Sequence, residues 1–300
     1  MKLAGVFAAA LMVAAPALAQ PQTPGADPHA GHAMEMQQAP AQSGARNPNL
    51  PPDNAAAPEQ LKSSPRHVDW VDVKGSNGTP IKTFVVYPER KDAAPVVIVI
   101  HEVFGLSDWV RGVADQLAKE GFIAVAPDLL SGMGPNKGGS QELGEQGATR
   151  AIGALKDEDK IRILNDVRTW ALTIPSSNGK LATIGFCWGG GTSFLYALNQ
   201  PAVNAAVSYY GPMPDTLDYS KAKAAILGLY AGNDNRVNSG IDKAKTELAN
   251  RKVTYEPHIF DGAGHGFLRQ QSGNAQAPGN AAATEQAWPL TLDFLRKYTK

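Results

Sequence analysis

Short apolar runs recur along the chain from about residue 67 onward, and segments with helical spacing of apolar residues separate them. Several runs are nearly continuous in apolar residues, which is typical of strands covered on both faces by helices. The runs are HVDWVDV (67–73), KTFVVYP (82–88), PVVIVIHEV (95–103), FIAVAPD (122–128), LATIGF (181–186), AAVSYYG (205–211), AILGLYAG (225–232) and VTYEPHIF (253–260). Strands that alternate with helices predict a mostly parallel sheet of about eight strands in a three-layer α/β domain.

The segments between these runs carry helix signals. Residues 107–121 begin with Ser107 as an N-cap, continue with apolar residues at helical spacing, and end at Gly121. Further helices are predicted for 159–174, for the residues after Cys187, for 240–250 and for 283–298. Ligands of such sheets bind outside the carboxyl ends of the strands. We therefore look for catalytic residues at strand ends rather than in the middle of helices.

The first residues have the pattern of a secretory signal peptide. Residues 1–19 place Lys2 before an apolar stretch and end with small residues at Ala17 and Ala19. We expect cleavage after Ala19 and a mature protein that is periplasmic or secreted. No later stretch stays apolar long enough to cross a bilayer, so we predict no membrane span.

Residues 20–65 are rich in Pro, Ala, Gln and Gly and contain few large apolar side chains. Such a segment buries too little surface to offset its ordering entropy, which predicts a disordered linker. Within it, His29, His32, Met34 and Met36 could meet a soft metal such as copper. We prefer to interpret them as part of a solvated polar tail, because metal sites normally need rigid supporting contacts. We therefore predict no metal site.

Residues 66–300 are enough for one large domain with a substantial core. The 28 Lys and Arg residues balance the 28 Asp and Glu residues, so nothing indicates a nucleic-acid partner. We expect a monomer without a cofactor. Cysteines in an oxidising compartment usually come in pairs, but Cys187 is the only cysteine of the chain. Its thiol is therefore expected to be buried or used.

The sequence GFCWG (185–189) has the spacing of a nucleophile elbow, G-x-S-x-G, with cysteine in place of serine. It follows the apolar run 181–186 and precedes a predicted helix, and the glycines are needed because a sharp turn crowds the backbone. Helix N-terminal amides would then point at the thiol of Cys187, favour its thiolate and donate to an oxyanion. The alternative is that Cys187 is merely a small packed residue.

A cysteine nucleophile needs a base, and His265 lies in the Gly-rich segment FDGAGHGFLR after the run 253–260. His258 lies inside that run and His67 near the start of the domain, so we interpret both as structural. His265 is therefore the predicted general base.

The third member of such a triad is an acid that orients the imidazole, placed between nucleophile and histidine in the chain order of α/β-hydrolases. Asp234, just after the run 225–232, meets this requirement. Asp215 and Asp261 are weaker alternatives, and Asp234 could instead be a turn-forming residue.

The run VIVIHEVFG (97–105) predicts a buried strand that ends at His101 and Glu102. In the hydrolase architecture the loop after this strand supplies one oxyanion amide, here that of Val103, which would pair with the amide of Trp188. A carboxylate at Glu102 would lie close to the nucleophile. Its alternative role is a salt bridge at the rim of the domain.

Four segments, HEVFG, GFCWGG, GNDNRV and GHGFLR, occur in this order between Val97 and Arg269. With them the chain resembles the dienelactone hydrolases, or carboxymethylenebutenolidases, enzymes of the α/β-hydrolase fold. The resemblance covers essentially the whole folded part. The four motifs together are specific for the family and much less so for its founding substrate.

The resemblance implies that Cys187 is the nucleophile, His265 the base and Asp234 its orienting acid. Glu102 would match a glutamate that interacts with the cysteine and helps to generate thiolate when substrate arrives. A free thiol is only a few per cent ionised at neutral pH. Such gating would also limit oxidation of an exported thiol.

Arg269, four residues after His265, would match an arginine that binds a substrate carboxylate. A second substrate-binding arginine is also expected, and Arg150 is a candidate that no motif fixes. The signal peptide and the long linker differ from the cytoplasmic type enzymes, so the natural substrate is left open.

These observations predict an exported hydrolase of a lactone or small carboxylic ester, with a Cys-His-Asp triad and an acyl-enzyme intermediate. The substrate would be a small molecule, with or without a carboxylate. The alternative is a non-catalytic exported binding protein, or one that responds to redox conditions through its thiol, since fold does not imply function.

Overall fold

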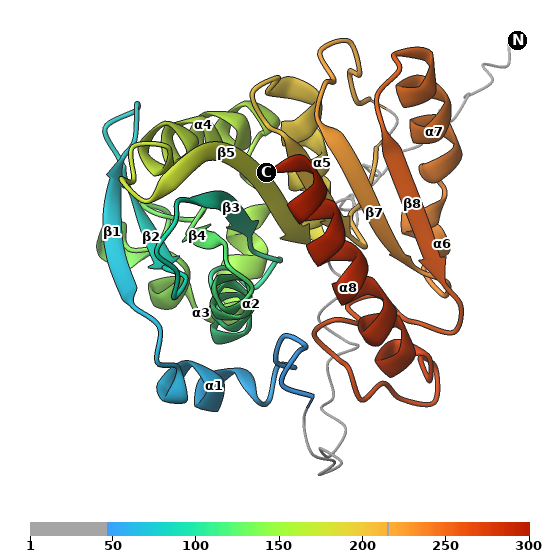
Figure 1. The fold of residues 1–300 in the computed structure, drawn as a ribbon, viewed down its shortest axis with the longest axis horizontal. Coiled ribbons are helices and arrows are strands. Elements are labelled where there is room, and N and C mark those ends of the chain that lie inside the picture. The colour runs from blue at the N-terminus through green and yellow to red at the C-terminus, as the bar shows by residue number, and fades with distance from the viewer. Residues whose placement is uncertain (1–46, 215) are drawn as a thin grey trace, which may run out of the picture. The chain divides into compact units, whose positions relative to one another are not determined.

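The computed structural model of the protein describes residues 47–214 and 216–300, which form an eight-stranded sheet flanked by helices (Figure 1). The strand order is β1-β2-β4-β3-β5-β6-β7-β8, with β2 antiparallel to β1 and β4 and all later pairs parallel. The strands are β1 (Val68–Lys74), β2 (Pro80–Val86), β3 (Ala94–Ile100), β4 (Ile123–Pro127), β5 (Ser177–Phe186), β6 (Ala205–Tyr209), β7 (Ala225–Ala231) and β8 (Tyr255–Phe260). The predicted three-layer α/β-hydrolase architecture with a mostly parallel sheet is confirmed.

Helices cover both faces of this sheet. In Figure 1, α8 crosses one face, and α4 and α5 lie on the opposite face. The helices are α1 (Ala57–Ser63), α2 (Asp108–Lys119), α3 (Ser140–Ile152), α4 (Asp157–Ala171), α5 (Trp188–Asn199), α6 (Asn235–Asn238), α7 (Ile241–Asn250) and α8 (Asn280–Tyr298), with a 3₁₀ turn at Pro135–Lys137. Helix α2 begins as predicted, because the Ser107 side chain accepts a hydrogen bond from the amide of Val110.

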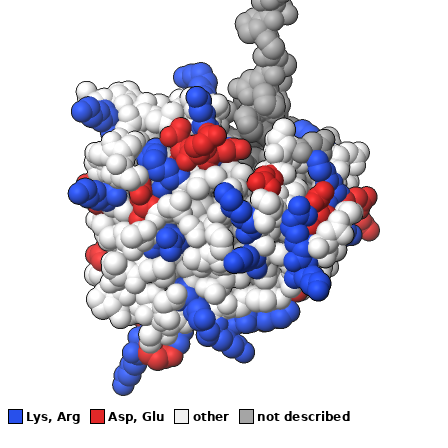
Figure 2. Space-filling model, turned by 90° about the horizontal axis from the view of Figure 1, so that it is seen from above, with Lys and Arg blue, Asp and Glu red and all other residues white. Residues whose placement is uncertain are grey.

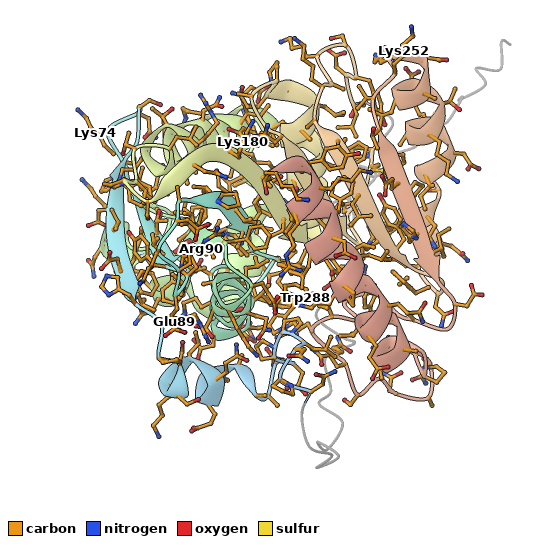
Figure 3. All side chains as sticks on the ribbon, in the orientation of Figure 1. Lys74, Glu89, Arg90, Lys180, Lys252 and Trp288 are labelled. Carbon is orange, nitrogen blue, oxygen red and sulfur yellow. The ribbon has the colours of Figure 1, made fainter. Side chains whose placement is uncertain are left out.

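The core lies between the sheet and its two helical layers. Every residue of β3 is buried, which explains why its sequence is continuously apolar rather than alternating. Trp109 of α2 packs edge-on against Phe186 of β5, with 4.8 Å between ring centroids. Figure 3 shows that side chains fill the space between the ribbons, Trp288 of α8 among them, whereas Lys74 and Lys252 point outward. Charges of both signs are scattered over the face drawn in Figure 2.

The segment 47–65 corrects the predicted domain boundary. Instead of belonging to a linker, it contains α1 and packs on the domain, with Leu50 and Ala57 buried. The indole Nε1 of Trp109 donates to the carbonyl oxygen of Pro52 at 3.0 Å. These contacts hold a segment whose composition indicated disorder. The packed part of the chain therefore includes residues 47–65, which precede the predicted domain start at residue 66.

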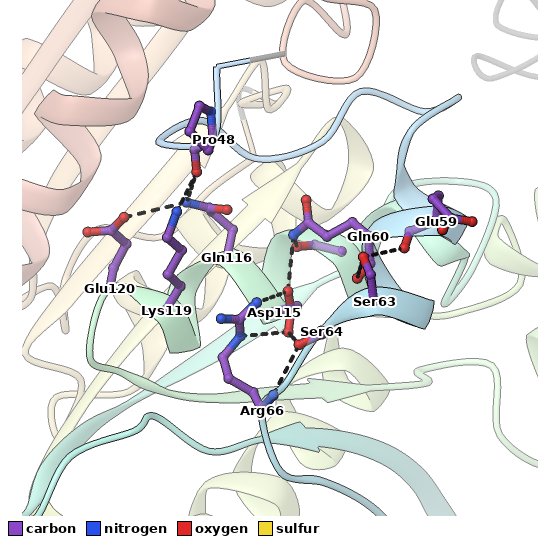
Figure 4. A network of polar contacts seen from close by, with 11 residues as sticks. Pro48, Glu59, Gln60, Ser63, Ser64, Arg66, Asp115, Gln116, Lys119 and Glu120 are labelled. Atoms are coloured by element: carbon purple, nitrogen blue, oxygen red, sulfur yellow. Dashed lines mark hydrogen bonds and ion pairs between the residues drawn. The ribbon is translucent and has the colours of Figure 1, made fainter. Parts of the chain in front are cut away.

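A buried carboxylate, that of Asp115, binds side chains at the end of this segment (Figure 4). Asp115 of α2 accepts two hydrogen bonds from the guanidinium of Arg66, at 2.8 and 2.5 Å, and one from the hydroxyl of Ser64 at 2.5 Å. The amide of Gln60 donates to the same carboxylate at 3.1 Å. The charge of Asp115 is therefore paired with Arg66, and both of its carboxylate oxygens accept hydrogen bonds from residues 60–66.

The predicted signal peptide, its cleavage site and the His29 to Met36 group lie outside the described residues. Between residues 47 and 300, position 215 aside, no helix combines the length and the apolar character needed to cross a bilayer.

Candidate active site

Cys187 lies in the sharp turn between β5 and α5, at the carboxyl end of the central strands. Its backbone has a positive φ of 53°, and its side chain is buried. A Cβ on Gly185 would stand 1.9 Å from the carbonyl oxygen of Gly189, and one on Gly189 would stand 2.3 Å from that of His101. The two glycines are therefore required by close backbone approach, as the elbow spacing predicts.

His265 and Asp234 meet at the same edge of the sheet, in the turns after β8 and β7 respectively. The Nδ1 atom of His265 is 2.5 Å from the Oδ2 atom of Asp234. Asp234 also caps α6 by accepting from the amide of Val237. Burial favours the neutral acid, yet the hydrogen bond and charge of His265 outweigh it and lower the pKa of Asp234.

His265 also interacts electrostatically with Cys187. Burial opposes a charge on the imidazole, but a negative sulfur at Cys187 and the hydrogen bond with Asp234 raise the pKa of His265 to about 10. The protonated form of His265 is therefore favoured when the sulfur beside it carries a negative charge. The structure brings Asp234, His265 and Cys187 together in the order that nucleophile activation requires.

The alternative residues that the structure describes differ from these in exposure or in the element that carries them. Asp261 is exposed, His258 lies in β8, and the side chain of His67 is 71% exposed beside Asp69. Asp215 lies outside the described residues. Arg150 is exposed in the last turn of α3, unlike Arg269, which is buried.

Glu102 and Arg269 form a buried ion pair close to His265. The Nε atom of Arg269 is 3.4 Å from Oε2 of Glu102, and the guanidinium also lies 4.8 Å from the ring centroid of Phe104. Burial raises the pKa of Glu102 to about 7, although the charges of Arg269 and His265 act in the opposite direction. The carboxyl group therefore changes charge near neutral pH, beside the proposed nucleophile.

Replacing Glu102 with glutamine is expected to change the pH dependence of stability. The folded-state pKa of about 7 lies above the usual value of 4.5, so stability that Glu102 provides below pH 4.5 is lost as pH rises through 7. Glu102→Gln should therefore gain thermal stability over the wild type progressively between pH 5 and 8. Glu142→Gln is the matched control, because the amide of Gly139 lowers the pKa of Glu142. Its effect on the pH dependence of stability is therefore confined to the range below pH 5. A flat difference for Glu102→Gln between pH 5 and 8 would contradict the assignment.

His101, for which the sequence predicts no role, contacts the loop that is expected to supply an oxyanion amide. Its Nε2 atom accepts from the amide of Leu129 at 3.1 Å, so the ring proton stands on Nδ1, which donates to the carbonyl of Glu102 at 2.8 Å. Burial lowers the pKa of His101 and keeps the ring neutral. The carbonyl of Glu102 and the amide of Val103 belong to one rigid peptide group, so His101 sets the direction of that amide.

The two segments expected to supply oxyanion amides lie against each other. The rings of His101 and Trp188 stack, with 5.7 Å between centroids and 14° between planes. Val103 and Trp188 are both buried. The only sequence signal for His101 was its position at the end of a predicted strand. Its imidazole contacts a residue that follows β4, and the sequence around His101 does not predict that contact.

The described residues contain no group of three or more His, Cys, Asp or Glu side chains that could hold a metal ion. The titratable side chains described above at this edge of the sheet include the thiol of Cys187, the imidazole of His265, the carboxyl groups of Asp234 and Glu102, and the guanidinium of Arg269.

Comparison with known proteins agrees with this arrangement. The model of the dienelactone hydrolase family matches residues 81–299. A protein of Saccharolobus solfataricus named "Putative carboxymethylenebutenolidase" is 30% identical over 256 residues, which covers 75% of this chain and 97% of the relative. One of the same name from Escherichia coli K12 is 29% identical over 236 residues, with 74% and 84% covered.

Solved structures show the same fold. A dienelactone hydrolase from Anabaena variabilis aligns with a TM-score of 0.59 at 20% identity, covering 78% of this chain and 99% of that one. An esterase from Pyrococcus furiosus aligns with a TM-score of 0.58 at 16% identity, covering 81% and 96%. The chain therefore belongs to the dienelactone hydrolase family and is a hydrolase of the esterase type.

Proposed function

We propose that this protein is an exported, monomeric hydrolase that cleaves a lactone or small carboxylic ester through a thioester on Cys187. The observation that carries the proposal is the position of His265, which is hydrogen-bonded to Asp234 and interacts electrostatically with Cys187. The names of the relatives, which refer to carboxymethylenebutenolide, support a lactone that bears a carboxylate. The N-terminal sequence pattern supports export.

In the acylation step the proton of the Cys187 thiol moves to His265, the sulfur attacks the carbonyl carbon, and the carbonyl electron pair moves onto oxygen. The amides of Val103 and Trp188 stabilise this oxyanion. When the oxyanion collapses, the carbon–oxygen bond of the ester or lactone breaks, and protonated His265 gives its proton to the leaving oxygen. The acyl group remains bound to Cys187 as a thioester.

Deacylation reverses these roles. Neutral His265 removes a proton from water, whose oxygen attacks the thioester carbon, and the thiolate of Cys187 leaves as the acid is released. Asp234 holds the imidazole through Nδ1 in both steps. Arg269 would bind a substrate carboxylate, which competes with Glu102 for the guanidinium. The negative charge of the released Glu102 carboxylate would then favour movement of the thiol proton to His265.

A panel of 4-nitrophenyl esters and lactones, each with and without a carboxylate, tests the proposal. We expect turnover by the full-length mature protein and higher kcat/KM for carboxylate-bearing members. Turnover of no member, with a thiol that still reacts with alkylating reagents, would favour the alternative of a binding or redox-responsive protein.

Arg269→Gln should remove the preference for carboxylates. Loss of a charge-assisted hydrogen bond is expected to lower the ratio of kcat/KM for charged over neutral substrates by about 10- to 100-fold. Arg150→Gln is the matched control, since Arg150 is exposed, and its ratio should equal that of the wild type. An unchanged ratio in Arg269→Gln would show that Arg269 does not bind the substrate carboxylate.

A further inference from the structure

Tyr210 has an unusual backbone conformation next to the proposed nucleophile. It directly follows β6, at the carboxyl edge of the sheet where Cys187 and Asp234 also stand. Its φ is 39°, in a region that bulky residues seldom adopt, and its amide donates to the carbonyl of Leu229 at 2.8 Å. Strain of this kind persists where surrounding contacts impose it, and it gathers at functional sites.

The side chain of Tyr210 is directed into the site. Its ring lies 5.0 Å from that of His265 and 5.3 Å from that of Phe267, measured between centroids. Burial raises the pKa of Tyr210 well above its usual value, and the negative charges of Glu102 and Cys187 raise it further. The hydroxyl therefore keeps its proton and can donate it to an acceptor.

Among the described residues this hydroxyl has no hydrogen-bond partner, although Tyr210 is only 1% exposed. The neighbouring Tyr209 is equally buried, but its hydroxyl is bonded to that of Thr291 at 2.7 Å. The hydroxyls of Tyr230 and Tyr255 are bonded to each other at 2.8 Å. Buried polar groups are normally paired, so the exception at Tyr210 needs an explanation.

We propose that Tyr210 is a substrate-contacting residue whose hydroxyl donates a hydrogen bond to a negatively charged oxygen of the bound substrate. The inference rests on the proposed function. Two oxygens have this chemistry, namely that of a substrate carboxylate held by Arg269 and that of the tetrahedral intermediate on Cys187. The guanidinium and the sulfur both interact electrostatically with this hydroxyl.

Tyr210→Phe, which removes only the hydroxyl, tests the proposal, with Tyr209→Phe as the matched control. In Tyr210→Phe kcat/KM should fall about 10- to 100-fold, because a hydrogen bond to a charged oxygen is lost. Its unfolding temperature should stay the same or rise, because none of the described residues loses a hydrogen bond. Tyr209→Phe should behave in the opposite way, with kcat/KM within about twofold and a lower unfolding temperature, since the buried hydrogen bond between Tyr209 and Thr291 is lost.

Comparing neutral and carboxylate-bearing esters identifies the acceptor. A loss confined to carboxylate-bearing esters indicates the carboxylate, and an equal loss on both indicates the tetrahedral oxygen. Unchanged kcat/KM on both would overturn the proposal.

Alkylation of Cys187 gives a readout that does not depend on turnover. Iodoacetate carries a carboxylate and iodoacetamide does not, so Tyr210→Phe should lower the ratio of their alkylation rates if the hydroxyl reaches a carboxylate. If the wild type hydrolyses nothing and this ratio still falls, the proposed function fails while the donor role of Tyr210 stands. If the wild type hydrolyses nothing and the ratio is unchanged, both are overturned.

Discussion

Cys187→Ala is expected to lower kcat for the best ester or lactone by about 10⁴-fold or more, because removing the nucleophile of a triad removes the covalent route. The fold should survive, since alanine fills most of the space of this buried side chain. Residual catalysis would come from the oxyanion amides and from binding alone.

Mass spectrometry of the quenched reaction checks the same mechanism directly. The wild type should carry the mass of the acyl group, and Cys187→Ala should carry none. Cys187→Ser is a weaker test, because serine in this elbow can retain some function. Full activity in Cys187→Ala would exclude the thioester mechanism.

Asp115→Ala is expected to lower the free energy of unfolding by about 3–5 kcal/mol, because it leaves a buried guanidinium at Arg66 without its partner. The side chain of Arg66 is 9% exposed, so water replaces little of the lost interaction. Ser64 and Gln60 lose their acceptor in the same step. Urea unfolding of the mature protein measures the change.

Asp108→Ala is the matched control, because it removes a carboxylate from the same helix whose partner Arg111 lies near the surface. Exposed pairs contribute about 1 kcal/mol or less, so this variant should stay close to the wild type. Equal stability of the two variants would show that residues 57–66 are not integral to the domain, as the composition of that segment originally indicated.

The parts of the fold that could be predicted are those encoded by local periodicity. The buried strand β3 is apolar at every position, and the glycines around Cys187 stand where only a glycine fits. Chain order allows Asp215, Asp234 and Asp261 alike, and the position of Asp234 just after an apolar run favoured it. In the structure the carboxylate of Asp234 lies 2.5 Å from Nδ1 of His265.

The missed parts depend on contacts between distant segments. Pro52 binds Trp109 through a backbone carbonyl, a group that every residue carries, so no side-chain pattern signals the contact. The role of His101 depends on the amide of Leu129, another backbone group. Tyr210 could be placed at a strand end, but nothing in the sequence distinguishes its unpaired hydroxyl from the paired one of Tyr209.

The packing of residues 47–65 also determines when the domain can be completed during synthesis. The amide of Asn54 donates to the carbonyl of Arg269, and Gln271 donates to the carbonyl of Pro51, a contact that spans 220 residues. Contacts this far apart in sequence form only after a long loop has closed. Pro51 and Asn54 therefore acquire these two contacts only after the chain around Arg269 has been made, whereas the contact of Pro52 with Trp109 needs a much shorter stretch of chain.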